Sequence, residues 1–119
     1  MSEIGKTQKT GRRGEEEAVK FLRNKGYQIV ERNVRSGLGE LDIVCRFKSE
    51  LIFVEVKAKV GEIWGSPEEM VNQRKLNKLR LLAENYQKGF KGTRRIDVVA
   101  VVFGRNEEVE RIEHYDSVS

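Results

Sequence analysis

A glutamate and a lysine stand two positions apart within a strand-like apolar run. The run is Leu51–Lys59, where Glu55 and Lys57 alternate with valine and alanine. Residues i and i+2 of a β-strand point to the same face of a sheet, so the two charged side chains should lie side by side. Charged groups in a buried strand are costly unless they are paired or bind a metal ion. The pattern therefore indicates either a structural ion pair or a metal-assisted catalytic site.

A second acidic segment, containing Glu40 and Asp42, lies directly upstream. If the two segments form a hairpin that turns at residues 48–49, Asp42 lies opposite Glu55 and Glu40 lies opposite Lys57, with Cβ atoms about 4.5–5.5 Å apart. A register shift of one residue would instead place the two acids on opposite faces. With the even-numbered loop, all these charged side chains share one face. The apolar residues expected on the other face are Leu41, Ile43, Cys45, Ile52, Val54 and Val56.

Two carboxylates at this spacing repel each other unless a cation lies between them. Oxygen ligands favour Mg²⁺ or Mn²⁺ over Zn²⁺. An ion held by Asp42 and Glu55 could activate a bound water and stabilise the charge that develops on a phosphodiester. Lys57 is suited to position that water or to neutralise the developing charge. The pattern thus predicts hydrolysis of a nucleic-acid backbone, and the alternative is a purely structural cross-strand ion pair.

A third acid, Glu15, falls on the apolar side of the expected first helix. The residues three, four and seven positions further on are Ala18, Val19 and Leu22, so Glu15 shares the core-facing side. An acid in that position should meet a cation across the interface. The alternative is that Glu15 complements the helix dipole, as its two neighbouring glutamates do.

Composition sets the limits on these hypotheses. A chain of 119 residues fits a single compact domain. The 23 Lys and Arg against 19 Asp and Glu give a net charge of +4, which suits a polyanionic partner and equally suits an ordinary solvated surface. No apolar run reaches membrane-spanning length and residues 1–10 lack a signal-peptide stretch, so a soluble cytoplasmic protein that contacts no membrane is expected.

The sequence contains one cysteine, Cys45, and one histidine, His114. These numbers exclude an internal disulfide and a site built from two histidine ligands within one chain. Cys45 lies in an apolar strand and is expected to be a small buried hydrophobic residue. Asp97, in the most apolar strand, is expected to be a structural partner of Arg94 or Arg95, and the alternative is that it supports Lys57 or the first helix.

The order of elements predicts an α/β layered domain, α-β-β-β-α-β, with a final edge strand. Residues 1–9 are expected to be flexible, and the strand Arg95–Phe103 is expected at the centre of the sheet. The first expected helix runs from Thr10 to Lys25 and is followed by Gly26 as its C-terminal cap. The second begins at the capping box Ser66–Glu69 and ends at Gly89. The expected strands are Tyr27–Asn33, Glu40–Phe47, Leu51–Lys59, Arg95–Phe103 and Glu108–His114.

Five motifs follow one another along most of the chain. They are Gly11-x-x-Gly14-Glu15-x-x-Ala18, Gly26-Tyr27-x-Ile29-Val30-x-Arg32-Asn33-x-Arg35, Gly39-Glu40-Leu41-Asp42-Ile43-Val44, Phe53-Val54-Glu55-Val56-Lys57 and Arg95-Ile96-Asp97-Val98-Val99-Ala100. Together these motifs resemble the YraN-like family of bacterial proteins. That family looks like a minimal member of the PD-(D/E)xK nucleases, similar in layout to archaeal Holliday junction resolvases. The resemblance implies a restriction-endonuclease-like layered domain with a mixed central sheet.

By the same resemblance, four residues take catalytic roles. Glu15 matches the helix-borne acid, Asp42 and Glu55 match the metal ligands and Lys57 matches the catalytic lysine. The cofactor implied is Mg²⁺ or Mn²⁺, with Glu15 as a third ligand. Leu41 stands where the motif of the superfamily has proline, so one identifying mark is missing.

Basic residues near these positions are candidates for phosphate contacts, which would make binding depend on salt. The basic candidates are Arg12, Arg13, Arg32, Arg35, Lys59 and Lys75, and the neutral Gln73 could also reach a phosphate or the attacking water. Trp64 could stack on a base or could anchor its loop to the core.

The leading hypothesis is a Mg²⁺-dependent endonuclease that acts on DNA, including branched or damaged DNA. The alternatives are a nucleic-acid-binding protein without turnover and an adaptor of the DNA repair or uptake machinery, both on the same fold. A two-fold homodimer would suit a symmetric junction.

Overall fold

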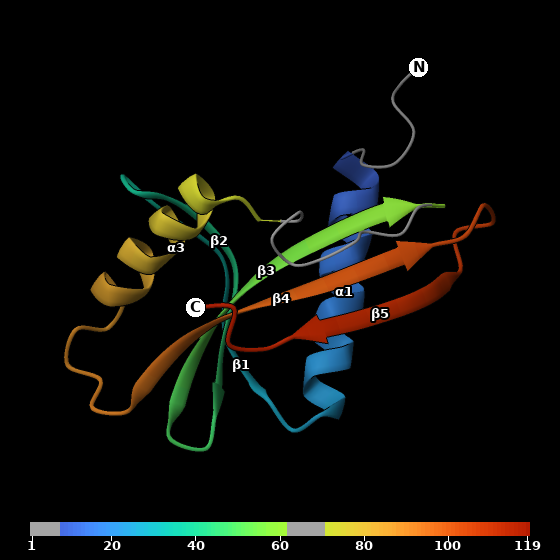
Figure 1. Cartoon of the computed structure of the whole chain (residues 1–119). Coiled ribbons are helices and arrows are strands. Elements are labelled where there is room, and N and C mark those ends of the chain that lie inside the picture. Colours follow the sequence, from blue (N-terminus) through green and yellow to red (C-terminus); the bar gives the residue numbers. More distant parts are fainter. Residues whose placement is uncertain (1–7, 62–70) are drawn as a thin grey trace.

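A five-stranded mixed sheet with one helix on each face forms the described part of the protein (Figure 1). The computed structural model describes residues 8–61 and 71–119. The strands are β1 (Gln28–Ser36), β2 (Gly39–Phe47), β3 (Glu50–Val60), β4 (Thr93–Phe103) and β5 (Val109–Tyr115), and the helices are α1 (Gln8–Asn24) and α3 (Gln73–Asn85). The strands lie in the order β1-β2-β3-β4-β5, and only β3 and β4 are parallel. The predicted α/β layered fold is therefore confirmed, including its final edge strand.

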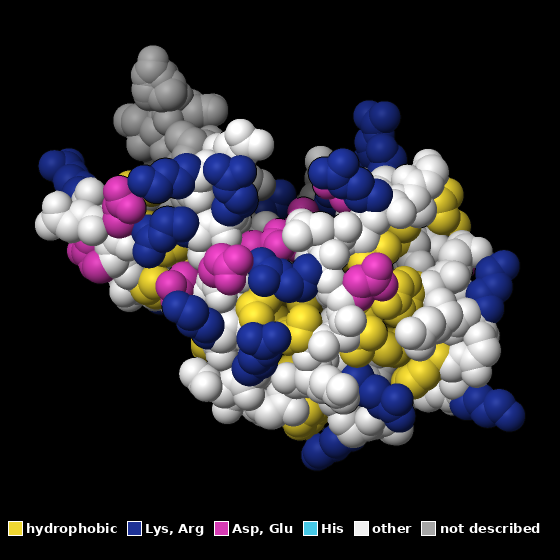
Figure 2. Space-filling view, turned by 180° about the vertical axis from the view of Figure 1, so that it is seen from behind, with side chains coloured by type: hydrophobic (Ala, Val, Ile, Leu, Met, Phe, Trp, Pro, Cys, Tyr) yellow, Lys and Arg dark blue, Asp and Glu magenta, His cyan; other side chains and the backbone are white. Residues whose placement is uncertain are grey.

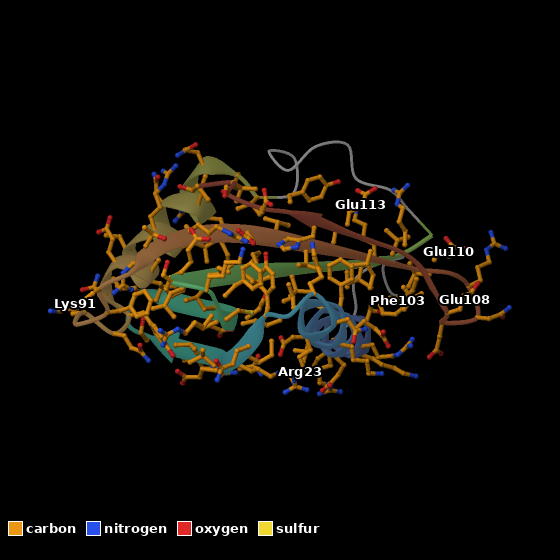
Figure 3. The ribbon with its side chains drawn as sticks, turned by 90° about the horizontal axis from the view of Figure 1, so that it is seen from below. Arg23, Lys91, Phe103, Glu108, Glu110 and Glu113 are labelled. Atoms are coloured by element: carbon orange, nitrogen blue, oxygen red, sulfur yellow. The ribbon has the colours of Figure 1, made fainter. Side chains whose placement is uncertain are left out.

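The two helices cover opposite faces of the sheet, as the view from below shows (Figure 3). Helix α1 packs its buried face on one side of β2, β3 and β4, and α3 packs on the other side of the same strands. Strand β4 shows the alternation that this requires, since Val98 and Ala100 face α3 while Val99 and Val101 face α1. Its sequence is apolar throughout because both of its faces are covered.

The end of α1 follows its sequence signals. Gly26 has a φ of 93°, a left-handed conformation that glycine adopts without strain, and the Tyr27 amide then donates to the Leu22 carbonyl. This bond turns the chain back towards the sheet. Tyr27 is consequently buried and stacks on Phe47 with ring centroids 4.6 Å apart.

Gly14 allows α1 to lie directly on β3. A Cβ atom at Gly14 would lie 2.5 Å from the Ala58 Cβ, closer than two carbon atoms can approach. We expect Gly14→Val to lower the free energy of unfolding by about 1–3 kcal/mol, because the helix must move away from the sheet. Urea denaturation measures the change.

The matched control is Gly89→Val, since a Cβ atom there has no atom within 4 Å. Equal stability losses in the two variants would contradict a close approach of α1 to β3.

Some element boundaries differ from the sequence predictions. Residues 8 and 9 belong to α1 instead of a flexible terminus. Helix α3 begins at Gln73 with Asn72 as its N-cap and ends at Asn85, before the predicted Gly89. The Ser66–Glu69 capping box and Trp64 lie outside the described residues. The middle strand of the sheet is β3, with β4 second from the edge, because the chain adds β5 beyond β4 as an antiparallel partner.

Candidate active site

Strand β2 separates from β3 at the predicted acidic residues. The predicted register is confirmed from Phe47–Glu50 to Ile43–Val54, where the ladder ends. The expected next pair, Asp42 opposite Glu55, is not formed. Instead, the Asp42 Oδ2 atom accepts a hydrogen bond of 2.8 Å from the Val56 backbone amide. The Asp42 carboxylate therefore lies against the peptide that joins Glu55 to Val56.

The separation changes which side chains face which helix. Leu41 packs with the α3 core although Ile43, two residues away, packs with the α1 core, so the prediction that they share a face was wrong. In β1, the partner Val34 also turns to the α3 core, and Asn33 before it has a φ of 54°. A left-handed residue interrupts the alternation of a strand, which explains the change of face.

Glu55 is nearly buried and lies between two lysines. Its side chain is 7% exposed, and its Oε2 atom lies 3.7 Å from Lys57 Nζ and 3.7 Å from Lys75 Nζ. Lys57 belongs to the same strand and Lys75 to α3. A carboxylate buried to this degree requires such partners to stay ionised, because desolvation disfavours its charge. Glu40 takes no part, since it is exposed and lies 3.8 Å from Arg35 instead of opposite Lys57.

The start of α3 determines where Lys75 lies. The Asn72 side chain caps the helix by accepting a 2.9 Å hydrogen bond from the Lys75 amide. Lys75 is thus in the first turn, and its side chain reaches the sheet. Gln73 lies on another side of the helix, where its amide donates to Asn77 Oδ1 at 3.1 Å. Gln73 and Lys75 were both predicted to contact the substrate; of these two, Lys75 is the one that lies beside Glu55.

Glu15 is tied to β1 by Arg32. The Arg32 Nη2 atom lies 3.2 Å from Glu15 Oε1 and 3.2 Å from Glu16 Oε2. Burial would lower the pKa of Arg32, but hydrogen bonds from its guanidinium to the two carboxylates raise it above its ordinary value. The cation that was expected across the interface from Glu15 is therefore Arg32, whose partner in the β1–β2 ladder is Ile43, the residue after Asp42.

The other predicted basic residues differ in their surroundings. Arg13 donates to the Glu107 carbonyl at 2.8 Å and lies over the Phe103 ring, so it ties α1 to the end of β4 that Figure 3 labels at Phe103. Arg12 is exposed on α1, and Lys59 is half-exposed near the end of β3. Viewed from behind, the molecule carries many Lys and Arg side chains with Asp and Glu among them (Figure 2). Arg13 thus has a structural role beside any phosphate contact.

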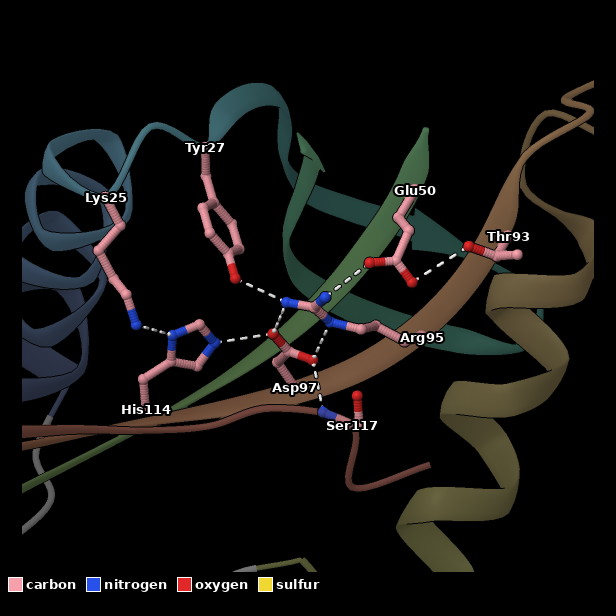
Figure 4. Close-up of polar contacts among 8 residues, drawn as sticks. All are labelled: Lys25, Tyr27, Glu50, Thr93, Arg95, Asp97, His114 and Ser117. Atoms are coloured by element: carbon pink, nitrogen blue, oxygen red, sulfur yellow. Dashed lines mark hydrogen bonds and ion pairs between the residues drawn. The ribbon is translucent and has the colours of Figure 1, made fainter. Parts of the chain in front are cut away.

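A buried polar network lies on the α1 face, and the sequence prediction included only part of it (Figure 4). Asp97 is 0% exposed and accepts hydrogen bonds from Arg95 Nε at 3.0 Å and from the Ser117 amide at 2.9 Å. His114 Nε2 lies 2.7 Å from the other Asp97 oxygen, and Lys25 Nζ lies 2.8 Å from His114 Nδ1. Because an ammonium can only donate, His114 Nδ1 accepts from Lys25, and the His114 Nε2–H group donates a hydrogen bond to Asp97. The predicted Asp97–Arg95 pair is confirmed.

Cys45 is buried in the apolar core beneath α1, near enough to the network to feel the charge of Asp97. Burial raises the pKa of the Cys45 thiol to about 12, and the nearby Asp97 charge adds to the effect. The thiol is therefore protonated at neutral pH, as expected for a small buried hydrophobic residue. A buried, protonated thiol is unsuited to nucleophilic catalysis, because the thiolate is the reactive form.

Of the predicted metal ligands, Asp42 lies against the backbone next to Glu55, because its carboxylate accepts from the Val56 amide. Carboxylate oxygens are a donor type that fits Mg²⁺ or Mn²⁺. Within residues 8–61 and 71–119, no three His, Cys, Asp or Glu side chains are close enough together to hold a metal ion. Glu15 as a third ligand stays a prediction.

Fold and site together define a small α/β protein whose acidic and basic groups meet where two strands separate. The chain belongs to the uncharacterised protein family UPF0102, whose family model matches residues 14–101. The resemblance to the YraN-like family is thereby confirmed. In the part of the chain that is described, no helix is long and apolar enough to span a membrane.

Relatives of similar length support this assignment. A UPF0102 protein of Pelotomaculum thermopropionicum is 46% identical over 110 residues, which cover 90% of this chain and 92% of the relative. A UPF0102 protein of Desulforamulus reducens is 44% identical over 109 residues, covering 87% and 89%. A third, from Desulfosudis oleivorans, is 44% identical over 112 residues, covering 92% and 90%. The similarity therefore extends over nearly the whole chain.

Proposed function

We propose that this protein is a metal-dependent nuclease that hydrolyses phosphodiester bonds of DNA. The observation that carries the proposal is the hydrogen bond from the Val56 amide to Asp42, which holds one carboxylate beside the buried Glu55 and its lysine partner Lys57. The Asp42 carboxylate accepts from this amide just beyond the point where the β2–β3 ladder ends. Its position beside a second acid and an amine suits phosphodiester chemistry.

Each residue of the site would have its own role in the reaction. Asp42 and Glu55 would hold a Mg²⁺ or Mn²⁺ ion, which when bound supplies an activated water and a counter-charge for the phosphate. Lys57 lies next to Glu55 and can hold a water molecule or donate to a phosphate oxygen in the transition state. The Val56 amide fixes the Asp42 carboxylate, so this acid does not have to reorganise when substrate binds.

The test is cleavage of four-way junction, flap, nicked, single-stranded and RNA substrates in Mg²⁺ or Mn²⁺. We expect cleavage of at least one DNA substrate with either ion and none in EDTA. Lys57→Met should lower the turnover by about 100-fold, because one donor to the developing charge is lost. The measurement is single-turnover rate by gel electrophoresis.

The control for Lys57→Met is Lys91→Met, which changes an exposed lysine in the loop before β4. The Lys91→Met protein should cleave DNA at the wild-type rate. Equal rates in the wild type and Lys57→Met would mean that a contaminant or another site cleaves the substrate.

A second candidate is a nucleic-acid-binding protein without turnover. It is favoured by the two ammonium groups that already compensate the Glu55 charge in this structure. Binding that persists with every metal ion while no substrate is cleaved would support this candidate and contradict the nuclease.

A further inference from the structure

Two ammonium groups share one carboxylate oxygen at the centre of the candidate site. Lys57 and Lys75 both lie 3.7 Å from Glu55 Oε2, but they reach it from different elements. The Lys57 side chain is 25% exposed, and the Lys75 side chain is 40% exposed. Lys75 is therefore the partner with more room to move.

The position of Lys75 in α3 is electrostatically unfavourable by itself. It lies in the first turn of a 13-residue helix, where the helix dipole disfavours positive charge. An anionic partner offsets this cost, and in the present structure that partner is Glu55. Any change that engages the Glu55 carboxylate elsewhere leaves Lys75 in need of another anion.

We propose that Lys75 exchanges partners, pairing with Glu55 when no divalent cation is present and with a phosphate oxygen of DNA when one occupies Asp42 and Glu55. A divalent cation on these carboxylates repels an ammonium within about 4 Å, and the more exposed lysine is the one displaced. This inference rests on the proposed function, because it takes DNA as the substrate. It makes Lys75 a substrate-binding residue whose contact depends on the metal ion.

A phosphate suits the displaced lysine for two reasons. A lysine ammonium is a compact point charge with donors only, which suits a phosphate oxygen. The first turn of α3 also lies at the positive end of the helix dipole, which favours an anion. Lys75 and the start of α3 would thus contact the same phosphate group.

The experiment measures how the affinity for a fluorescein-labelled 20-base-pair DNA duplex depends on NaCl, with Ca²⁺ and with EDTA. Between about 50 and 200 mM NaCl, each phosphate contact adds about 0.9 to the slope of log affinity against log salt. In Ca²⁺, Lys75→Met should show a slope about 0.9 smaller than the wild type. In EDTA, the two proteins should show the same slope, because Glu55 already holds the lysine.

Two further variants make this result specific. Lys75→Arg retains a cation and should restore the wild-type slope in Ca²⁺. Lys78→Met removes an exposed lysine three residues further along α3 and should change the slope equally in Ca²⁺ and in EDTA, or not at all. Thermal denaturation checks that each variant is folded.

The outcomes separate the exchange from the nuclease. A slope for Lys75→Met that falls equally in Ca²⁺ and in EDTA, or in neither, overturns the exchange, as does a wild type whose binding ignores Ca²⁺. If the predicted slopes are found but no DNA is cleaved, the exchange stands and the nuclease fails. If DNA is cleaved but the slopes do not differ, the nuclease stands and the exchange fails.

Discussion

Replacing Asp42 with asparagine is expected to lower DNA cleavage on the order of 1,000-fold or more without unfolding the protein. The amide oxygen of asparagine can still accept the hydrogen bond that the Val56 amide donates, so the separation of β2 from β3 is retained. What is lost is one negative charge, and with it the affinity for a divalent cation and the stabilisation of the transition state. Single-turnover rates at saturating Mn²⁺ and isothermal titration with Mn²⁺ measure the two losses.

The matched control for Asp42→Asn is Asp116→Asn, which removes an exposed carboxylate near the end of β5. It should leave the rate and the affinity for Mn²⁺ unchanged. If Asp42→Asn instead binds Mn²⁺ as tightly as the wild type, Asp42 is not a metal ligand and the proposed site is wrong.

Replacing Asp97 with alanine is expected to cost about 3–5 kcal/mol of stability, the largest effect on folding that we predict. The substitution leaves the His114 Nε2 proton without its anionic acceptor. It also removes one of the two carboxylates that pair with the largely buried Arg95 guanidinium, the other being Glu50. Urea denaturation measures the loss. A loss below about 1 kcal/mol, the size typical of ordinary substitutions, would show that the network does not depend on this carboxylate.

The Asp97 carboxylate should also make the free energy of unfolding depend on pH in the acidic range. Burial would raise the pKa of Asp97, but hydrogen bonds from His114 and Arg95 and from the Ser117 amide hold it below its ordinary value of 3.8. Since the folded-state pKa is depressed, the carboxylate stabilises the folded protein above that ordinary value. The contribution is lost as pH falls through the lower folded-state pKa. Below about pH 4 the wild type should therefore lose stability more steeply than Asp97→Asn.

The hairpin at the centre of the site was predictable because strand periodicity is simple. The even-numbered loop between β2 and β3 gives the observed register, and the period of two places Glu55 and Lys57 close together. The buried face of α1 was predictable for the same kind of reason, since Ala18 and Leu22 recur at helical spacing. Both predictions depend only on local geometry.

The end of the β2–β3 ladder was not predictable from periodicity. It depends on a left-handed Asn33 in the neighbouring strand and on the Asp42 side chain taking the place of a backbone acceptor. Both are irregularities that break the alternation from which register is predicted. Asp42 is an acid between apolar residues of a strand, which indicates an unusual position. It does not predict where the strands separate or which group the carboxylate contacts.

Contacts between distant segments were also missed. Lys75 reaches Glu55 only because α3 docks on the sheet with its first turn towards β3, and no spacing in the sequence specifies that orientation. His114 reaches Asp97 because the β4–β5 ladder pairs it with Val99. The sequence pattern predicts His114 only as part of an edge strand. Its contact with Asp97 depends on the register between β4 and β5, which periodicity alone does not predict.

The parallel pairing of β3 with β4 also has a consequence for the order of folding. The strands β1, β2 and β3 are joined by short turns and can pair through contacts close in sequence. Pairing of β3 with β4 begins at Glu50 and Thr93, so a long loop must close first. Asp42, Glu55 and Lys57 therefore belong to the three antiparallel strands that can form early. Lys75 lies in α3, within the connection from β3 to β4, and is positioned only when β4 pairs with β3. During refolding, Asp42 and Glu55 should accordingly reach their places in the sheet before Lys75 contacts Glu55.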